Sequence, residues 1–152
     1  MSDSLSFDDT SPRWALPFLF AGQAQKEIFV NEALSRLDML LHPLVEGRRS
    51  NPPASPQEGE AWIVDSGASG TWAGHDAEIA CRQSGNWVFA APQVGMTVHD
   101  RSTGERWIYV EAWEAAPAAV TVSGGSTVDV EARAAIGAIV AALSHYGLMC
   151  QS

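Results

Sequence analysis

Hydrophobic residues between Asn31 and Leu44 recur at every third or fourth position. They are Ala33, Leu34, Leu37, Leu40, Leu41 and Leu44. This spacing puts them on one face of a helix, so the pattern predicts an amphipathic helix that buries that face. Asparagine is favoured at a helix N-cap, and a proline disfavours helical backbone in the residue before it. We therefore expect the helix to begin at Asn31 and to end at His42-Pro43.

From residue 60 onward the spacing changes to that of β-strands. Short segments rich in β-branched and aromatic residues alternate with glycine-containing turns, among them Ser84-Gly85 and Thr103-Gly104. Glycine supplies the positive φ that tight hairpins need. The pattern predicts an antiparallel meander or a small barrel-like domain with strands at 60–64, 76–82, 86–90, 96–100, 105–110 and 119–122.

The end of the chain returns to a helical pattern. Ser126 or Thr127 is suited to cap this helix, and Gly147 is suited to the left-handed position that ends one. Between them, hydrophobic residues follow the a and d spacing of a coiled coil: Ile136, Ile139, Leu143 and Tyr146. Isoleucine at both a and d favours three or more strands, which predicts a short trimeric bundle. The alternative is that the stripe packs on the chain's own β-domain, and the spacing alone favours neither.

Two other segments lack a regular pattern. Residues 14–20 are apolar, but Pro17 makes an extended segment docked on a core a better interpretation than a helix. Residues 51–60 are rich in proline and predict a linker. The sequence thus indicates an α+β chain in three parts: an N-terminal arm and helix (1–50), an antiparallel β-domain (51–125) and a C-terminal oligomerisation helix (126–152).

The charge of the chain limits its partners. It has 152 residues, with 18 acidic and 9 basic side chains and a formal net charge of −9. Nucleic acid and anionic lipid surfaces would repel such a chain. There is no hydrophobic run of the ~20 residues that span a bilayer, and the acidic N-terminus is unlike a secretory signal. Cys81 and Cys150 lack a paired spacing, so we expect two free thiols in a reducing cytosol.

The six tryptophans raise the question of carbohydrate binding, because aromatic faces stack on sugar rings. Trp72 lies in a glycine-rich loop and Trp113 follows an acidic stretch, so these two are the binding candidates. His75 and Asp76, close to Trp72, would take sugar hydroxyls. The other candidates lie in predicted strands, where a core or sheet-face position is expected: Trp62, Trp87 and Trp107.

The sequence contains none of the common catalytic motifs that we sought: a phosphate-binding loop, a Gly-x-Ser-x-Gly elbow or a His-Glu-x-x-His helix. His75-Asp76 and His99-Asp100 contain metal-ligand residue types. Adjacent side chains on a strand point to opposite faces, however, so each pair supplies one ligand at most. We expect no metal, no cofactor and no catalysis. If the chain did hydrolyse glycans, Asp76 and Asp100 would be the first carboxylates to examine.

Several longer blocks occur in a fixed order: LPFLFAGQAQKEIFVNEALSRLD, PPASPQEGEAWIV, SGASGTWAGHDAEIA and GNWVFAAPQVGM. Together they resemble the DUF2793 family, uncharacterised domains found in prophages, tailed phages and gene transfer agents of alphaproteobacteria. The closing VDVEARAAIGAIVAALSHYGLM resembles the helix that commonly ends such proteins, so the resemblance covers about residues 12–148. One departure is Phe29-Val30-Asn31, where the family usually has Thr-His-Asn.

This resemblance implies a tail-fibre or related appendage subunit of a phage-like virion or gene transfer agent. Such proteins are usually trimers, made in the bacterial cytoplasm, released by lysis and used to touch a cell surface. We therefore expect a non-catalytic structural homotrimer in the virion that contacts other virion or baseplate proteins, with Gln23, Gln25 and Lys26 as assembly residues. The alternatives are a carbohydrate-binding module for capsular or cell-wall glycans and, less favoured, a hydrolase of surface glycans.

Overall fold

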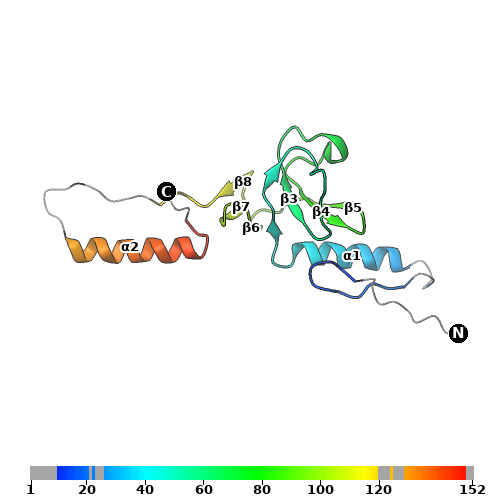
Figure 1. Ribbon diagram of the computed structural model, residues 1–152, viewed down its shortest axis with the longest axis horizontal. Coiled ribbons are helices and arrows are strands. Elements are labelled where there is room, and N and C mark those ends of the chain that lie inside the picture. Colours follow the sequence, from blue (N-terminus) through cyan, green and yellow to red (C-terminus); the bar gives the residue numbers. More distant parts are fainter. Residues whose placement is uncertain (1–9, 21, 23–25, 120–123, 125–128, 150–152) are drawn as a thin grey trace. The chain divides into compact units, whose positions relative to one another are not determined.

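A computed structural model describes residues 10–20, 22, 26–119, 124 and 129–149. These residues form an α+β fold with two α-helices and two small sheets (Figure 1). The chain divides into two compact units, residues 1–92 and 93–152. The three-part division expected from the sequence, whose second boundary lies outside the described residues, stays a prediction.

The first unit contains one helix and one complete sheet. The sheet consists, in this order, of β2 (Arg48–Arg49), β3 (Ala61–Val64), β4 (Ile79–Gln83) and β5 (Asn86–Ala90). Strand β2 pairs in parallel with β3, whereas the β3–β4 and β4–β5 pairs are antiparallel. The expectation of a barrel is wrong for this sheet, because β2 and β5 at its two edges do not pair with each other. The other elements of the unit are α1 (Lys26–Leu40), β1 (Leu44–Val45) and the 3-10 helix η1 (Gly70–Trp72).

The second unit contains β6 (Thr97–Asp100), β7 (Arg106–Tyr109), β8 (Trp113–Ala115) and α2 (Val130–His145). The three strands form an antiparallel meander. Five of the six predicted strands are therefore confirmed: β5 has the predicted bounds, and the other four differ by one to three residues at one or both ends. The strand predicted at 119–122 lies outside the described residues except for its first position, Ala119. Strands β1, β2 and β8 were not predicted, since two or three residues are too few to show alternation.

The core of the first unit lies on both faces of its sheet. Alternate residues of β3, β4 and β5 point to opposite faces. One face carries Ile63, Ile79 and Cys81, all fully buried, together with Met39 of α1. The other face carries a cluster of Trp62, Val64, Trp72 and Ala80.

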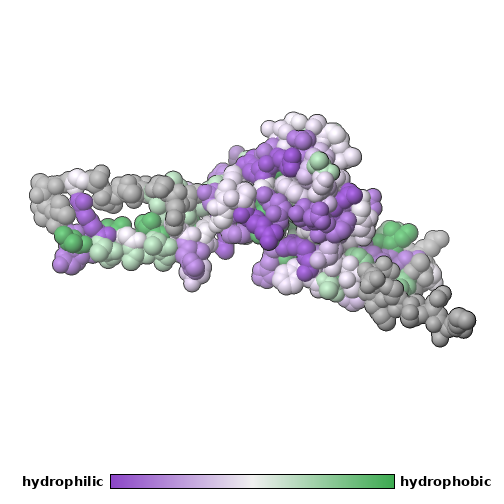
Figure 2. Space-filling view, viewed as in Figure 1, coloured by the Kyte–Doolittle hydropathy of each residue, from purple (hydrophilic) through white to green (hydrophobic). Residues whose placement is uncertain are grey.

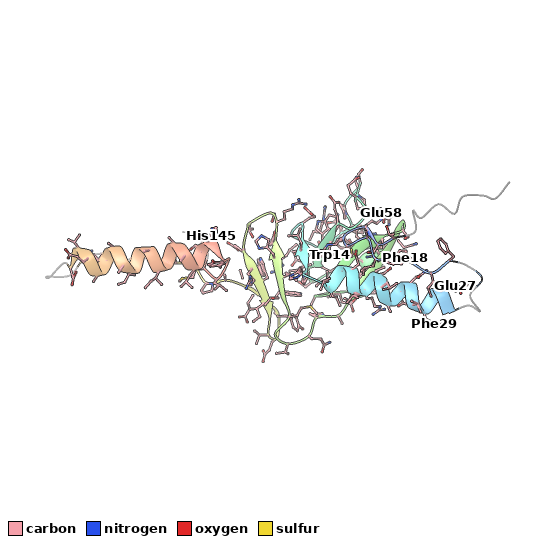
Figure 3. All side chains as sticks on the ribbon, turned by 90° about the horizontal axis from the view of Figure 1, so that it is seen from below. Trp14, Phe18, Glu27, Phe29, Glu58 and His145 are labelled. Atoms are coloured by element: carbon pink, nitrogen blue, oxygen red, sulfur yellow. The ribbon has the colours of Figure 1, made fainter. Side chains whose placement is uncertain are left out.

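The rotation of α1 differs from the prediction. Leu37 is 51% exposed and Leu41 is 41% exposed, whereas Asp38 and Met39 are buried. The face predicted to be buried is therefore largely open to solvent, and it continues through Ala33 to Phe29, which is 77% exposed. Figure 3 shows Phe29 at the amino end of α1 and Trp14 near its carboxyl end.

The predicted cap at Asn31 is also wrong, because α1 begins at Lys26 and Asn31 lies inside the helix. Its side-chain amide instead pairs with the main chain of Leu19. The Leu19 N–H donates to Asn31 Oδ1 at 2.8 Å, and Asn31 Nδ2 donates to the Leu19 carbonyl at 2.9 Å. The amide thus makes the two hydrogen bonds that a neighbouring strand would make with Leu19. Residues 15–20 are not helical, as predicted from Pro17.

A buried carboxylate explains the rotation of α1. Asp38 is 0% exposed, and its Oδ1 accepts hydrogen bonds from the Ser11 hydroxyl and from the Trp14 N–H, the latter at 2.7 Å. Its Oδ2 accepts from the Arg13 N–H at 3.1 Å and from Gln83 Nε2 at 3.4 Å. A carboxylate this well paired can be buried without a large penalty. The helix therefore turns Asp38 inward and leaves leucines outside.

The guanidinium of Arg13 closes the carboxyl end of α1. It donates to the carbonyls of Met39 at 2.9 Å, Asp38 at 3.3 Å and His42 at 2.8 Å. These carbonyls lack helical partners, so a side-chain cation there stabilises the helix end. These hydrogen bonds attach the turn at residues 11–14 to α1.

The buried thiol of Cys81 makes stability depend on pH. Burial raises the pKa of this thiol from 9.0 to about 12, and the nearby Arg13 guanidinium lowers it only in part. The folded thiol stays protonated while the unfolded thiol ionises above pH 9. The contribution of this thiol to stability is therefore fully present below pH 9 and is lost as the pH rises toward 12.

We expect the free energy of unfolding to fall above pH 9 by up to about 1.4 kcal/mol per pH unit from this group. Urea unfolding of the protein and of Cys81→Ala, each at about pH 8 and about pH 10, measures the effect. The variant lacks the thiol and should lose less stability between the two pH values. Equal losses in both proteins would contradict a thiol held neutral by burial. Cys150 lies outside the described residues.

Helix α2 is closed at both ends. The N-cap is Asp129, whose side chain accepts the Ala132 N–H at 2.9 Å; the expected caps Ser126 and Thr127 lie outside the described residues. At the other end, Gly147 has φ +68°, as predicted. The Leu148 N–H donates to the Leu143 carbonyl at 2.9 Å, which completes a Schellman motif.

Most of the side chains of α2 are exposed to solvent, although the turn that ends the helix is hydrogen-bonded to β7. The Arg106 N–H of β7 donates to the Gly147 carbonyl at 3.3 Å, so the last turn is attached to its own unit. None of the residues of α2 is buried, and Ile139 is 60% exposed. In this structure the hydrophobic stripe of α2 is not folded into the chain's own core.

Candidate functional site

A groove runs along β5, the edge strand of the first sheet. It has a volume of about 530 Å³ and combines aromatic rings with one ion pair, Glu32–Arg36, and one histidine–carboxylate contact, His75–Glu78. Its residues come from α1, from the loop before β4, from β5 and from the residue that follows β5: Glu32, Arg36, His75, Glu78, Trp87, Val88, Phe89 and Ala91.

One wall of the groove contains an imidazole fixed on two sides. The ring of His75 stacks on Phe89 with 3.6 Å between centroids and 5° between planes. Its Nδ1 lies 2.8 Å from Glu78 Oε2. This arrangement fixes the ring and the carboxylate, so the wall presents a preorganised polar edge beside an aromatic face.

The opposite wall is part of α1. Arg36 donates to Glu32 Oε1 from Nη2 at 2.8 Å and from Nε at 3.2 Å, one helical turn apart. Both side chains are about half exposed. An exposed pair of this kind adds little stability, so its charges remain available to a ligand.

The base of the groove is continuous with the tryptophan core. The ring of Trp87 meets Trp72 edge-on at 5.0 Å between centroids and meets Trp62 edge-on at 5.8 Å. The guanidinium of Arg82 lies over Trp87, 5.5 Å from the ring centroid. Trp87 is half-buried, so it contributes both to the core and to the groove.

The candidate sugar-stacking residues do not line this groove. Trp72 is 0% exposed inside the core, and Trp113 is 6% exposed on β8, edge-on to Tyr109 at 5.4 Å. A buried indole offers no face on which a sugar ring could stack. The 65–78 loop folds back over the sheet, which is why a tryptophan in a glycine-rich segment became a core residue.

His75 and Asp76 are adjacent in sequence, but only His75 lines the groove, whereas Asp76 bonds to its own loop. The carboxylate of Asp76 accepts the main-chain N–H of Gly67 at 3.1 Å and of Ala68 at 3.0 Å, so it holds the loop closed. Asp100 is buried, and its carboxylate accepts the N–H and the hydroxyl of Ser102 at 2.8 and 2.6 Å. Each of the two aspartates that we considered for a hydrolase, Asp76 and Asp100, therefore makes hydrogen bonds that stabilise its own loop.

The predicted assembly residues are seen only in part. Gln23 and Gln25 lie outside the described residues, and Lys26 is the first residue of α1. Ile136 of α2 is 44% exposed, and Tyr146, the C-cap residue of this helix, is 68% exposed. Leu143 is partly exposed.

Within the described residues, no group of three or more His, Cys, Asp or Glu side chains is placed to hold a metal ion. No helix in the same part of the chain is long and apolar enough to cross a membrane.

Sequence reasoning missed most of the groove, although two signals for it were present. Trp87 and Phe89 alternate with Val88, which puts both rings on the same face of β5. Glu32 and Arg36 have the spacing of a helical ion pair. What the sequence does not show is that β5 is an edge strand and that α1 borders it.

Comparison with protein-family profiles matches residues 30–114 to the description "Protein of unknown function (DUF2793)". The match spans more than half of the chain. The chain belongs to the DUF2793 family. No curated protein matches it.

The DUF2793 match includes the whole groove and leaves out α2. Glu32, Arg36, His75, Glu78 and strand β5 all lie within residues 30–114, as do the other seven strands up to Glu114 of β8. Helix α2 begins sixteen residues after the match, at Val130. The residues of the groove therefore lie within the matched DUF2793 segment, whereas the C-terminal helix lies outside the matched residues.

Proposed function

We propose that this DUF2793 protein is a non-catalytic structural subunit of a phage-like virion or gene transfer agent. It assembles as a homotrimer through α2, and the particle uses it to contact the host cell surface. The observation that carries this proposal is the state of α2: a capped helix, apolar on nearly all sides, with no buried residue.

Such a helix needs a partner. An isolated helix of 16 residues is only marginally stable in water, and a helix that is hydrophobic all round is normally buried. Figure 2 shows the pale and green residues that cover the middle of α2. Its acidic and basic side chains lie near its two ends: Glu131 and Arg133 in the first turn and the imidazole of His145 at the last position. At about 24 Å the helix is shorter than the hydrocarbon core of a bilayer, so we expect protein to cover it.

Other copies of the chain fit this helix well. Ile136 and Ile139 occupy a and d positions, a choice that favours three strands over two. Alanine and Gly137 fill many of the positions between the stripe residues, and small side chains let helices approach closely. A symmetric bundle uses the same stripe from every copy, so it closes without a second kind of subunit.

The phage-like setting is supported by the sequence resemblance, which implies an appendage subunit. Family membership fits this setting, although the family is itself described as of unknown function. The groove on β5 and the exposed face of α1 supply surface for contacts with other particle proteins.

The first test is molar mass in solution. Light scattering coupled to size-exclusion chromatography, over a range of concentrations, should give three times the 16.2 kDa of one chain. A single-chain mass at high micromolar concentration would overturn assembly through α2. A second test concerns location: purified particles from producing cells should contain the chain in constant ratio to the capsid protein. Its absence from such particles would overturn the virion role, whatever the oligomeric state.

A further inference from the structure

Strand β5 leaves one side of its main chain unpaired. It lies at the edge of the order β2-β3-β4-β5, and in the part of the chain that the structure describes its only strand partner is β4. In antiparallel pairs, residues alternate between pointing their N–H and C=O groups toward the partner and away from it. The register therefore decides which main-chain groups of β5 face outward.

The hydrogen bonds of β4 settle this alternation. The Arg82 N–H donates to the Glu60 carbonyl at 2.9 Å, and the Arg82 carbonyl accepts the Gly59 N–H at 2.8 Å, both on the β3 side. Cys81 therefore points its groups toward β5, where it pairs with Val88. Trp87 pairs with Arg82 and Phe89 with Ala80, so the main-chain groups of Trp87 and Phe89 point away from β4. Among the described residues, no hydrogen-bond partner is seen for these outward groups.

The outward groups open into the groove described above. Trp87, Val88 and Phe89 line it, with Glu32 and Arg36 on one wall and His75 and Glu78 on the other. The β5 segment NWVFA has no lysine or proline, the residues that usually block an exposed edge. An aromatic and β-branched edge with free donors and acceptors at two-residue spacing is a template for one more strand.

We propose that this edge binds an extended segment of a partner polypeptide, which joins the sheet beside β5. Two donors and two acceptors spaced at about 7 Å match the repeat of a strand. The hydroxyls of a sugar chain have no such repeat, so the outward main-chain groups of β5 favour a peptide over a sugar. The β5 edge of a second copy does not fit, because each copy would bring its own α1 and its own 75–78 loop against those of the other. The occupant is a single extended segment, such as a terminus or linker.

The walls of the groove specify the side chains of this segment. Residues opposite Trp87 and Phe89 lie on the same face as those rings, so apolar side chains are expected there. The residue opposite Val88 lies on the face of α1, next to the Glu32–Arg36 pair. A basic or hydroxyl side chain suits that position, because the chain carries a net charge of −9.

Amide exchange measured by NMR tests the proposal on the unmodified protein. The probe is a peptide of about six residues, the usual strand length, in which valine alternates with threonine and one central lysine. At millimolar peptide, we expect exchange of the Trp87 and Phe89 amides to slow several-fold. The Val88 amide already bonds to β4 and should not change, which makes it a control within the same strand. The same peptide N-methylated at its valines keeps its side chains but loses the donors, and should give no protection.

A pair of variants isolates the main-chain contribution. Phe89→Ala and Phe89→Pro both remove the ring that stacks on His75, but only proline removes the outward N–H. Proline is tolerated at an outward-facing edge position, so both variants should fold, as near-ultraviolet circular dichroism will show. We expect peptide affinity of Phe89→Pro to be about tenfold lower than that of Phe89→Ala, the equivalent of one main-chain hydrogen bond.

Three results would overturn the proposal. One is unchanged exchange of the Trp87 and Phe89 amides at millimolar peptide. Another is equal protection by the N-methylated peptide, which would indicate nonspecific apolar contact. The third is protection of these amides by a soluble peptidoglycan fragment and not by the peptide, which would assign the groove to a sugar. None of these measurements depends on α2, so they are independent of the trimer test.

Discussion

Ile139→Asp should convert the proposed trimer into single chains. In the proposed bundle Ile139 lies at a d position in the middle of α2, so three copies of the new carboxylate would meet near one axis. Burying an unpaired carboxylate costs several kcal/mol, and three like charges repel one another. We expect the mass measured by light scattering to fall to that of one chain at concentrations where the parent protein is trimeric.

The matched control is Ala138→Asp, which places the same charge one residue earlier on the same exposed helix. That position is c in the heptad, outside the a/d seam, and its variant should remain trimeric. Far-ultraviolet circular dichroism will show whether α2 stays helical in each protein. Loss of the trimer in both variants would indicate a general effect of charge. A trimer that survives Ile139→Asp would place the interface elsewhere.

The single substitution Asp38→Ala should cause a large decrease in the free energy of unfolding of the first unit. The change removes the acceptor of the buried Ser11 hydroxyl and of the partly buried N–H groups of Arg13 and Trp14. Each unsatisfied buried donor costs about 1–3 kcal/mol, and some will relax toward water. We expect the free energy of unfolding to fall by about 3–5 kcal/mol.

Urea unfolding measures this loss, and Asp65→Ala is its control. Asp65 accepts hydrogen bonds from Arg48 in a pair that is about one-third exposed, so its removal should cost less than about 1 kcal/mol. Similar losses for the two aspartates would mean that the network around Asp38 contributes no more than a surface ion pair. A further sign of the expected effect is faster proteolysis within residues 11–20, which the carboxylate holds against α1.

The strands were predictable because local signals agree with the tertiary structure. Ser84 and Gly85 have φ values of 48° and 74°, so the two residues between β4 and β5 form a tight hairpin turn, as the glycine at this position predicted. The flanking strands then follow from their β-branched and aromatic residues. In such segments the sequence alone determines where the chain reverses.

The orientation of α1 was not predictable, because long-range polar contacts determine it. The spacing of leucines favours burial of Leu37 and Leu41, but the four donors to Asp38 come from residues 24 to 45 positions away in the chain. A hydrophobic pattern takes no account of such partners. The same limit applies to Asn31, whose preference for N-caps was overridden by its pairing with Leu19.

The groove shows a third limit. Its residue types are visible in the sequence, but its existence depends on which strand ends the sheet and on the helix beside that strand. Trp72 and Trp87 illustrate the point, since the loop tryptophan is fully buried and the strand tryptophan reaches the groove. Loop position is therefore a poor guide to exposure when the loop folds over a sheet.

The packing of Trp62, Trp72 and Trp87 gives the first unit an optical signature. Their ring centroids lie 5.0 to 6.2 Å apart at fixed tilts, so their electronic transitions couple and produce a near-ultraviolet dichroic band that fades when packing loosens. Helix α2 contains no tryptophan, and its melting registers in the far ultraviolet instead. One spectrometer can thus follow, without any label, whether the sheet and the terminal helix unfold together or separately.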